Sequence, residues 1–161
     1  MPLEIRHAQP RDSASIAEIA NAMIRDTLFT FTSQERQPQE IAARLEQDLT
    51  PFLVAERGGR ILGFATYSAF RSGPGYRHTQ EHSIQLRPEA QGHGLGRALM
   101  VQLEKEARTR EVHVLVAGIS SANPKALKFH RAVGYTQTGF LPQVGRKFNQ
   151  WLDLILMQKQ L

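Results

Sequence analysis

Three glycines, Gly92, Gly94 and Gly96, lie close together in the segment QGHGLG, after an apolar run and directly before a helical pattern. Because glycine costs a helix roughly 1 kcal/mol per residue relative to alanine, a cluster at a helix start indicates that the backbone itself is used. One interpretation is a flexible turn. The other is a cradle of unpaired backbone N–H groups that binds an anion at the positive end of the helix dipole.

Side chains that ligate metals do not gather in this sequence. His7, His78, His82, His93 and His113 have no metal-like spacing to one another or to acidic residues, and the chain has no cysteine. We therefore expect no metal site. The lack of cysteine also fits a cytoplasmic location, as does an N-terminal segment, MPLEIRHAQPRD, without the pattern of a signal peptide.

The totals are those of an ordinary soluble protein. The chain has 161 residues, 41% of them hydrophobic and 22% charged, and we expect a single domain over residues 1–161. No run approaches the roughly 20 apolar residues that cross a bilayer, so no membrane partner is expected. The net charge of +5 would suit a polyanionic ligand, but basic residues are scattered among acidic ones, which argues against nucleic acid.

The first half of the chain is predicted to form a strand, two helices and a hairpin. Residues 3–8 alternate as a short strand does, and a helical period follows. A second helix is predicted to open near Pro38. In PFLVAERGGRILGFATYSAF, two β-rich runs joined at Gly58 and Gly59 indicate an antiparallel hairpin. The face that the second helix is expected to bury comprises Ile41, Leu45 and Leu49.

A strand, a helix and a buried strand follow one another in the second half. In RHTQEHSIQL, Glu81 shares a strand face with Ser83 and Gln85, whereas His82 faces the other way. The helix from Gly94 leads into EVHVLVAGIS, whose apolar residues scarcely alternate, as in a fully buried strand. A short helix, NPKALKFHRAVGY, and two strands, YTQTGFL and WLDLILMQ, separated by PQVGRKFN, complete the chain. The order predicts an α/β sheet of mixed strand direction.

Two motifs in this order resemble those of a known superfamily. The segment from Gln91 to Gly96 resembles the acyl-coenzyme A signature of the GNAT superfamily of N-acetyltransferases: a Gln or Arg, two residues, Gly, one residue, then Gly or Ala. The segment NPKALKFHRAVGY is similar to a later motif, with Asn123, Ala126 and Gly134 at the expected spacing. The resemblance implies the GNAT fold: a mixed, mostly antiparallel sheet of six to seven strands, about four helices and a central βαβ unit.

A narrower resemblance covers nearly the whole chain. YRHTQEHSIQL, LKFHRAVGY and GRKFNQWLDL are similar to phosphinothricin and methionine sulfoximine acetyltransferases, whose pattern includes Gly145, Lys147, Trp151 and Asp153. The chain departs from that pattern in NAMI and in FTFTSQERQ, where relatives have a Tyr-Asn pair and a different Thr/Trp-rich loop. That loop borders the substrate in the family, so the departures leave the substrate open.

The resemblance implies acetyl-coenzyme A as cosubstrate. Its pyrophosphate would lie at the glycine-rich helix start, its pantetheine arm near Asn123, and an oxyanion donor would come from a backbone N–H of the strand before the glycines. We expect the cofactor to be bound by Ile84, Leu86, Gln91, Gly92, His93, Gly94, Leu95, Gly96, Arg97, Asn123 and Lys128.

Glu81 and His130 are the catalytic candidates. An amine must lose a proton before it attacks a thioester, and Glu81 is the candidate general base; the alternative is a surface glutamate in a cross-strand pair. His130 follows Asn123 by seven residues, where many GNAT enzymes place a tyrosine that is thought to protonate the leaving thiolate. It could be that acid, orient the cofactor sulfur, or be structural.

For the substrate carboxylate, the candidates are Arg71 and Lys147, with Tyr76 as a hydrogen-bond donor. The expected function is direct acetyl transfer to the α-amino group of a small amino-acid analogue, such as phosphinothricin, methionine sulfoximine or methionine sulfone. Relatives form homodimers through the C-terminal strands, so a homodimer is expected. The alternatives are another amine, such as a polyamine, an aminoglycoside or a protein N-terminus, and a non-catalytic acyl-coenzyme A binding module.

Overall fold

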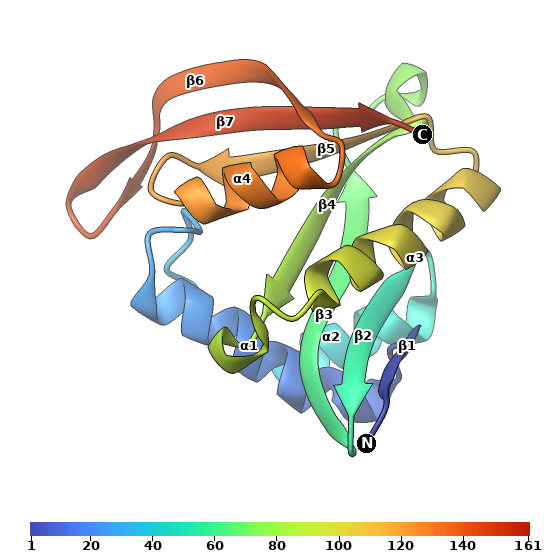
Figure 1. Cartoon of the computed structure of the whole chain (residues 1–161). Coiled ribbons are helices and arrows are strands. Elements are labelled where there is room, and N and C mark those ends of the chain that lie inside the picture. The colour runs from blue at the N-terminus through green and yellow to red at the C-terminus, as the bar shows by residue number, and fades with distance from the viewer.

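Seven strands form one sheet in the computed structural model, which describes residues 1–161 (Figure 1). The strands lie in the order β1-β2-β3-β4-β5-β7-β6. They are β1 (Leu3–His7), β2 (Phe52–Arg57), β3 (Arg60–Ala69), β4 (Thr79–Leu86), β5 (Val114–Ser120), β6 (Thr136–Lys147) and β7 (Gln150–Gln160). The helices are α1 (Ser13–Asp26), α2 (Pro38–Gln47), α3 (Leu95–Thr109) and α4 (Pro124–Ala132), with 3-10 turns at Pro10–Asp12, Pro74–Tyr76 and Pro88–Ala90.

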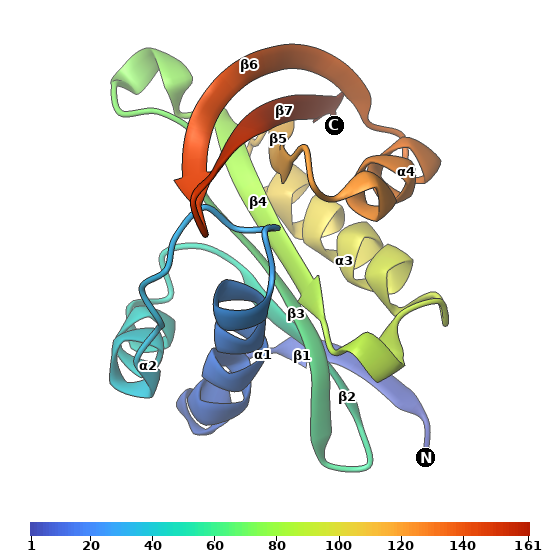
Figure 2. The ribbon, with the colours of Figure 1, turned by 90° about the vertical axis from the view of Figure 1, so that its left-hand side faces the viewer.

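The helices cover both faces of the sheet. Figure 2 shows α1 and α2 on one side and α3 and α4 on the other. The α3 stripe of Leu95, Leu99 and Leu103 is at most 1% exposed and packs on the larger core cluster. A second cluster joins α1 to β2 and β3, so that β2 is buried on both faces from Phe52 to Ala55. None of the helices combines the length and the apolar composition needed to cross a membrane.

Strand pairing confirms the predicted mixed sheet. Every neighbouring pair is antiparallel except β4 and β5, which are parallel and joined through α3. This is the expected central βαβ unit. The β2–β3 hairpin turns at Gly58 and Gly59, whose φ angles of 59° and 79° suit the primed turn that two-residue hairpins prefer.

Two predicted boundaries are wrong. Helix α2 ends at Gln47, Asp48 is left-handed with φ of 48°, and Leu49 is 76% exposed instead of lying on the buried face. The segment PQVGRKFN, predicted to separate two strands, is mostly strand: β6 runs on to Lys147 and turns only at Phe148 and Asn149. Because β6 is an edge strand, Pro142 needs no partner for its missing N–H, and the pairing register shifts between Leu141 and Gly145 instead.

Candidate active site

Strands β4 and β5 pair over only three residues and then separate. Residues Thr79–Glu81 pair with Val114–Val116, but β4 continues to Leu86 while β5 follows β7 to Ser120 (Figure 1). Beyond Glu81, the edge of β4 that faces β5 therefore has no strand partner. The gap holds a cavity of about 180 Å³, here named the β4–β5 cavity, and its backbone edge can hydrogen-bond a ligand.

The cavity brings together four predicted site residues, Glu81, Ile84, Asn123 and His130. Sequence reasoning missed the other side chains. Those on β4 and β5 line a gap between strands that no local pattern reveals, and nothing in the sequence places α1 and the aperiodic segment 27–37 beside β5. Only the family's substrate loop pointed to that segment. The missed lining residues are Met23, Phe29, Thr30, His82, Ser83, Gln85, Ala117, Gly118, Ile119, Ser120 and Ala126.

The Glu81 carboxylate lies over Gly118 of β5. Its Oε2 is 3.4 Å from the position that a Cβ on Gly118 would take, so the glycine leaves room for the carboxylate. The residues opposite Glu81 are Ser68 and Val116, and the carboxylate has no hydrogen-bond or ion-pair partner. A charged cross-strand pair is thus absent. Although part of the side chain faces open space, burial raises the pKa of the Glu81 carboxyl.

Both ring nitrogens of His130 are already engaged. Its Nδ1 is 2.7 Å from the carbonyl oxygen of Ala126, and its Nε2 is 2.9 Å from Nε2 of His82. Each histidine is only 5% exposed. Burial lowers the pKa of both imidazoles, that of His82 to about 3. The ring is therefore held as an uncharged wall of the cavity, with no free N–H to offer as an acid.

The glycine-rich turn leaves the start of α3 uncapped. Gly92 and Gly94 have φ angles of 78° and 81°, which glycine adopts without strain, and a Cβ at either position would meet nothing within 4 Å. No side chain caps the helix, so the first-turn N–H groups are free to bind an anion. Gly96 has a different role, because its Cβ would lie 3.1 Å from the Phe129 ring and push α3 away from α4.

The model of the acetyltransferase (GNAT) family matches residues 16–135. The chain belongs to this family. Acetyl-coenzyme A fits the site of this acetyltransferase. The open, uncapped start of α3 suits its diphosphate, and the unpaired edge of β4, the strand before that helix, suits its pantetheine arm.

Relatives with assigned activities align over nearly the whole acetyltransferase. An L-amino acid N-acyltransferase of Escherichia coli is 42% identical, covering 99% of this chain and 94% of the relative. A methionine sulfoximine and methionine sulfone acetyltransferase of Salmonella typhimurium is 40% identical, covering 99% of this chain and 95% of the relative.

Solved structures have the same fold. A ribosomal-protein-alanine N-acetyltransferase of Brucella melitensis superposes with a TM-score of 0.93 at 41% identity, covering 98% of this chain and 99% of the other. A phosphinothricin acetyltransferase of Sinorhizobium meliloti, solved with acetyl-coenzyme A, superposes with a TM-score of 0.92 at 33% identity, covering 100% of this chain and 89% of the other.

The remaining cofactor candidates of the acetyltransferase divide by exposure. The side chains of Leu95, Ile84 and Leu86 pack on the core. Leu95 is 1% exposed and can offer a ligand only its backbone, whereas Ile84 also lines the β4–β5 cavity. The Arg97 guanidinium donates to the Ala132 carbonyl at 3.1 Å and so ties α3 to the end of α4. Like Arg97, the side chains of Gln91, His93 and Lys128 are exposed.

Asn123 caps α4, as the sequence predicted, and also lines the cavity. Its Oδ1 accepts from the Ala126 N–H at 3.2 Å. We expect Asn123→Ala to lower the free energy of unfolding by about 1 kcal/mol, measured by chemical denaturation. Asn123→Asp keeps the capping oxygen and loses the amide donor. If Asn123 also donates to pantetheine, the Asp variant should fold normally but bind acetyl-coenzyme A more weakly; unchanged affinity would leave it a cap alone.

The substrate candidates lie in different places. Arg71 and Tyr76 are exposed beside Phe70, before β4, and line neither described cavity. Lys147 is only 4% exposed, and its Nζ donates to Thr30 Oγ1 at 2.9 Å. Because Thr30 lines the β4–β5 cavity, Lys147 holds segment 27–37 against it.

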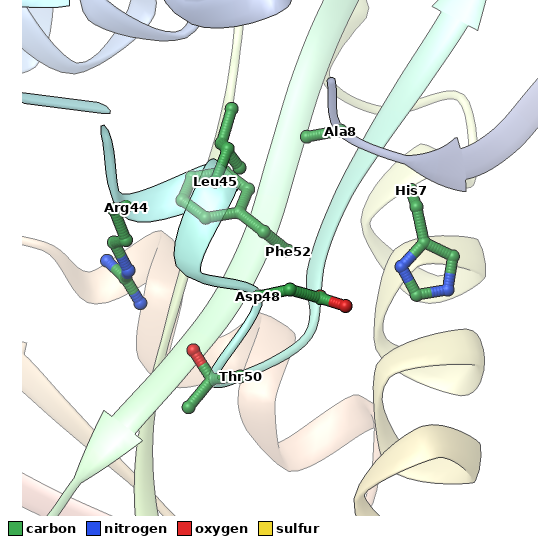
Figure 3. A pocket seen from close by; sticks show the side chains of 7 residues that line it. All are labelled: His7, Ala8, Arg44, Leu45, Asp48, Thr50 and Phe52. Atoms are coloured by element: carbon green, nitrogen blue, oxygen red, sulfur yellow. The ribbon is translucent and has the colours of Figure 1, made fainter. Parts of the chain in front are cut away.

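A second cavity, of about 270 Å³, lies between α2, β1 and β2 (Figure 3). It shares no residue with the β4–β5 cavity, and its one arginine, Arg44, already donates to Thr66 Oγ1 and the Tyr67 carbonyl. No predicted site residue lines it. Nowhere do three His, Cys, Asp or Glu side chains form a cluster that could hold a metal ion. The β4–β5 cavity is therefore the candidate active site.

Proposed function

We propose that this enzyme transfers acetyl from acetyl-coenzyme A to the α-amino group of a small amino-acid analogue of the phosphinothricin, methionine sulfoximine or methionine sulfone type. The observation that carries the proposal is the unpaired Glu81 carboxylate in a cavity at the parting of β4 and β5. The activities of the relatives, all aligned over nearly the full chain, support the substrate class.

Glu81 is the proposed general base. Its lone carboxylate can hold the substrate ammonium and then take one proton from it, since a raised pKa makes a carboxylate a better proton acceptor. The neutral nitrogen attacks the thioester carbon, and the C–S bond breaks. The nitrogen loses a second proton as the amide forms, and the departing sulfur gains one, so the protons balance without a separate acid.

For His130 we propose the orienting role that the sequence left open. Because hydrogen bonds engage both of its nitrogens, the His130 ring is better suited to orient the cofactor sulfur than to donate a proton. The transfer is proposed to be direct, without an acyl-enzyme, because the chain has no cysteine to act as a thiol nucleophile.

We propose that a cation holds the substrate carboxylate. Lys147 is the best placed, because it is buried beside Thr30 and no acidic side chain neutralises it. Desolvation lowers the pKa of its ammonium, so an incoming carboxylate would stabilise the charge. Arg71 and Tyr76 precede β4 and are proposed to bind the substrate where the strand begins.

We further propose that residues 1–161 form one cytoplasmic, metal-free domain that dimerises and binds neither nucleic acid nor membrane. The dimer is supported by an apolar edge on the β6–β7 hairpin, where large side chains are more than half exposed. These are Phe140, Val144, Phe148 and Trp151.

A second candidate acceptor is a protein N-terminus. One specific finding favours it, the 41% identity to a ribosomal-protein-alanine N-acetyltransferase. The two acceptors differ in the group attached beside the reacting amine: a free carboxylate, or a peptide chain that must leave the cavity. A non-catalytic acyl-coenzyme A binding module would bind the cofactor but acetylate neither a small amino-acid analogue nor a protein N-terminus.

Thiol release separates these functions. The purified enzyme is incubated with acetyl-coenzyme A and, in turn, methionine sulfoximine, methionine sulfone, phosphinothricin, the common amino acids and peptides with N-terminal alanine. We expect turnover of at least one of the three analogues with kcat/KM well above that for any peptide. Activity on peptides alone would overturn the proposed substrate, and cofactor binding without any turnover would overturn the enzyme.

A further inference from the structure

Two buried imidazoles, one on β4 and one on α4, face each other across the wall of the active site. The planes of the His82 and His130 rings differ by only 28°, and their centroids are 5.1 Å apart. The rings meet edge to edge, with their Nε2 atoms 2.9 Å apart. The Tyr135 ring meets both imidazoles edge-on, with its centroid 5.2 Å from that of His82 and 5.4 Å from that of His130. Both histidines line the β4–β5 cavity.

The hydrogen bonds fix where the protons of this pair lie. A carbonyl oxygen can only accept, so the 2.7 Å contact with the Ala126 carbonyl requires an N–H at Nδ1 of His130. An uncharged His130 then has a lone pair at Nε2. The short contact with His82 therefore requires His82 to carry its proton on Nε2 and to donate it to His130.

The opposite arrangement is disfavoured by the surroundings of His82. Its Nδ1 is buried and has no hydrogen-bond partner. If His130 took up a proton at Nε2, His82 would have to move its own proton to Nδ1, leaving a buried N–H without an acceptor. His82 thus resists the charging of His130.

Few other charges face the pair. Tyr135 lies between the imidazoles and Glu104 of α3, to which its hydroxyl donates, and Lys159 of β7 binds the same carboxylate. Glu81 lies on the opposite face of β4. Neither Glu104 nor Lys159 contacts an imidazole nitrogen, so His82 is the group in direct contact with Nε2 of His130.

We propose that His82 is a positioning residue whose Nε2–H holds the His130 ring, as an uncharged Nδ1–H tautomer, against the active-site cavity. This role rests on the proposed function, in which an ammonium must approach Glu81. A cation at His130 would repel that ammonium and would lower the proton affinity of the Glu81 carboxylate. By occupying the Nε2 lone pair, His82 keeps the cavity free of this charge.

The test compares His82→Phe, which keeps a ring without a donor, with His82→Gln, whose amide nitrogen can replace Nε2–H. In the Phe variant we expect the pKa of His130 to rise, because no N–H then occupies its Nε2 lone pair, although burial continues to lower it. Relative to wild type, kcat/KM should then fall more at pH 6 than at pH 9. The Gln variant should keep the wild-type profile.

The exposed His113 supplies the control, since His113→Gln should leave the profile unchanged. Equal profiles for His82→Phe and wild type, or a Gln variant that behaves like the Phe variant, would overturn the proposal. A melting curve of each variant tests whether it is folded.

Nitrogen-15 NMR of the unmutated protein tests the same proposal without catalysis. We expect His82 as the Nε2–H tautomer and His130 as the Nδ1–H tautomer, both uncharged at pH 6. A charged His130 at pH 6, or the reverse tautomers, would overturn the positioning role even if His82→Phe fails to fold. If instead no amine is acetylated while the tautomers are as stated, the proposed function fails and the hydrogen-bonded pair stands.

Discussion

Glu81→Gln is expected to lower kcat by about 10²- to 10⁴-fold, the usual contribution of a general base, while acetyl-coenzyme A binds as before. The amide is nearly the same size as the carboxylate and fits the space over Gly118, but it can take no proton and can offer the ammonium no charge. Turnover is measured by thiol release, and cofactor affinity by calorimetry. Folding stability should not fall, because the lost carboxylate had no partner.

The pH profile should change with the same substitution. Burial raises the pKa of Glu81, and the active form of a base is the unprotonated one. The rate of the unmutated enzyme should therefore fall as the pH falls through a pKa above that of an ordinary glutamate. This acidic limb should be missing from the residual rate of Glu81→Gln.

The control is Glu89→Gln, which lies just beyond the other end of β4. Glu89 is exposed and its carboxylate pairs with Arg60, and an exposed ion pair contributes little, so its loss should leave both stability and kcat nearly unchanged. If Glu81→Gln kept wild-type turnover, Glu81 would be no base, and the proposed mechanism would be wrong even if the acceptor amine were right.

The sequence predicted most of the fold because local periodicity is strong in this chain. The alternation in β4 put Glu81 and His82 on opposite faces, and the contacts of Gly118 and His130 confirm it. The apolar run of β5 and the stripe on α3 predicted the parallel βαβ unit for the same reason. These features depend on residues two to four positions apart.

The features that the sequence could not predict depend on residues far apart. The parting of β4 and β5 beyond Glu81 results from β5 following β7, a pairing across some 40 residues that leaves no local pattern. The bond from His82 to His130 spans 48 residues, and that from Lys147 to Thr30 spans 117. A single sequence shows each of these side chains but not its partner, so His82 looked like an ordinary strand residue.

Gly94→Ala is expected to weaken acetyl-coenzyme A binding on the order of 10-fold, with little change in kcat once the enzyme is saturated. Gly94 holds φ at 81°, where an alanine costs about 1–2 kcal/mol, and its Cβ would project into the open space before the helix start. Either relaxing the turn or filling that space would displace the first-turn N–H groups from a diphosphate, and 1.4 kcal/mol corresponds to tenfold in affinity.

Gly59→Ala separates backbone strain from cofactor binding. Gly59 has nearly the same φ, 79°, and a Cβ there would likewise meet nothing within 4 Å, but it turns the β2–β3 hairpin and lies outside the candidate active site. Both variants should lose similar stability in denaturant, whereas only Gly94→Ala should lose affinity in calorimetry. Equal affinity for the two would mean that the glycine-rich turn is a packing feature, and the diphosphate would have to bind elsewhere.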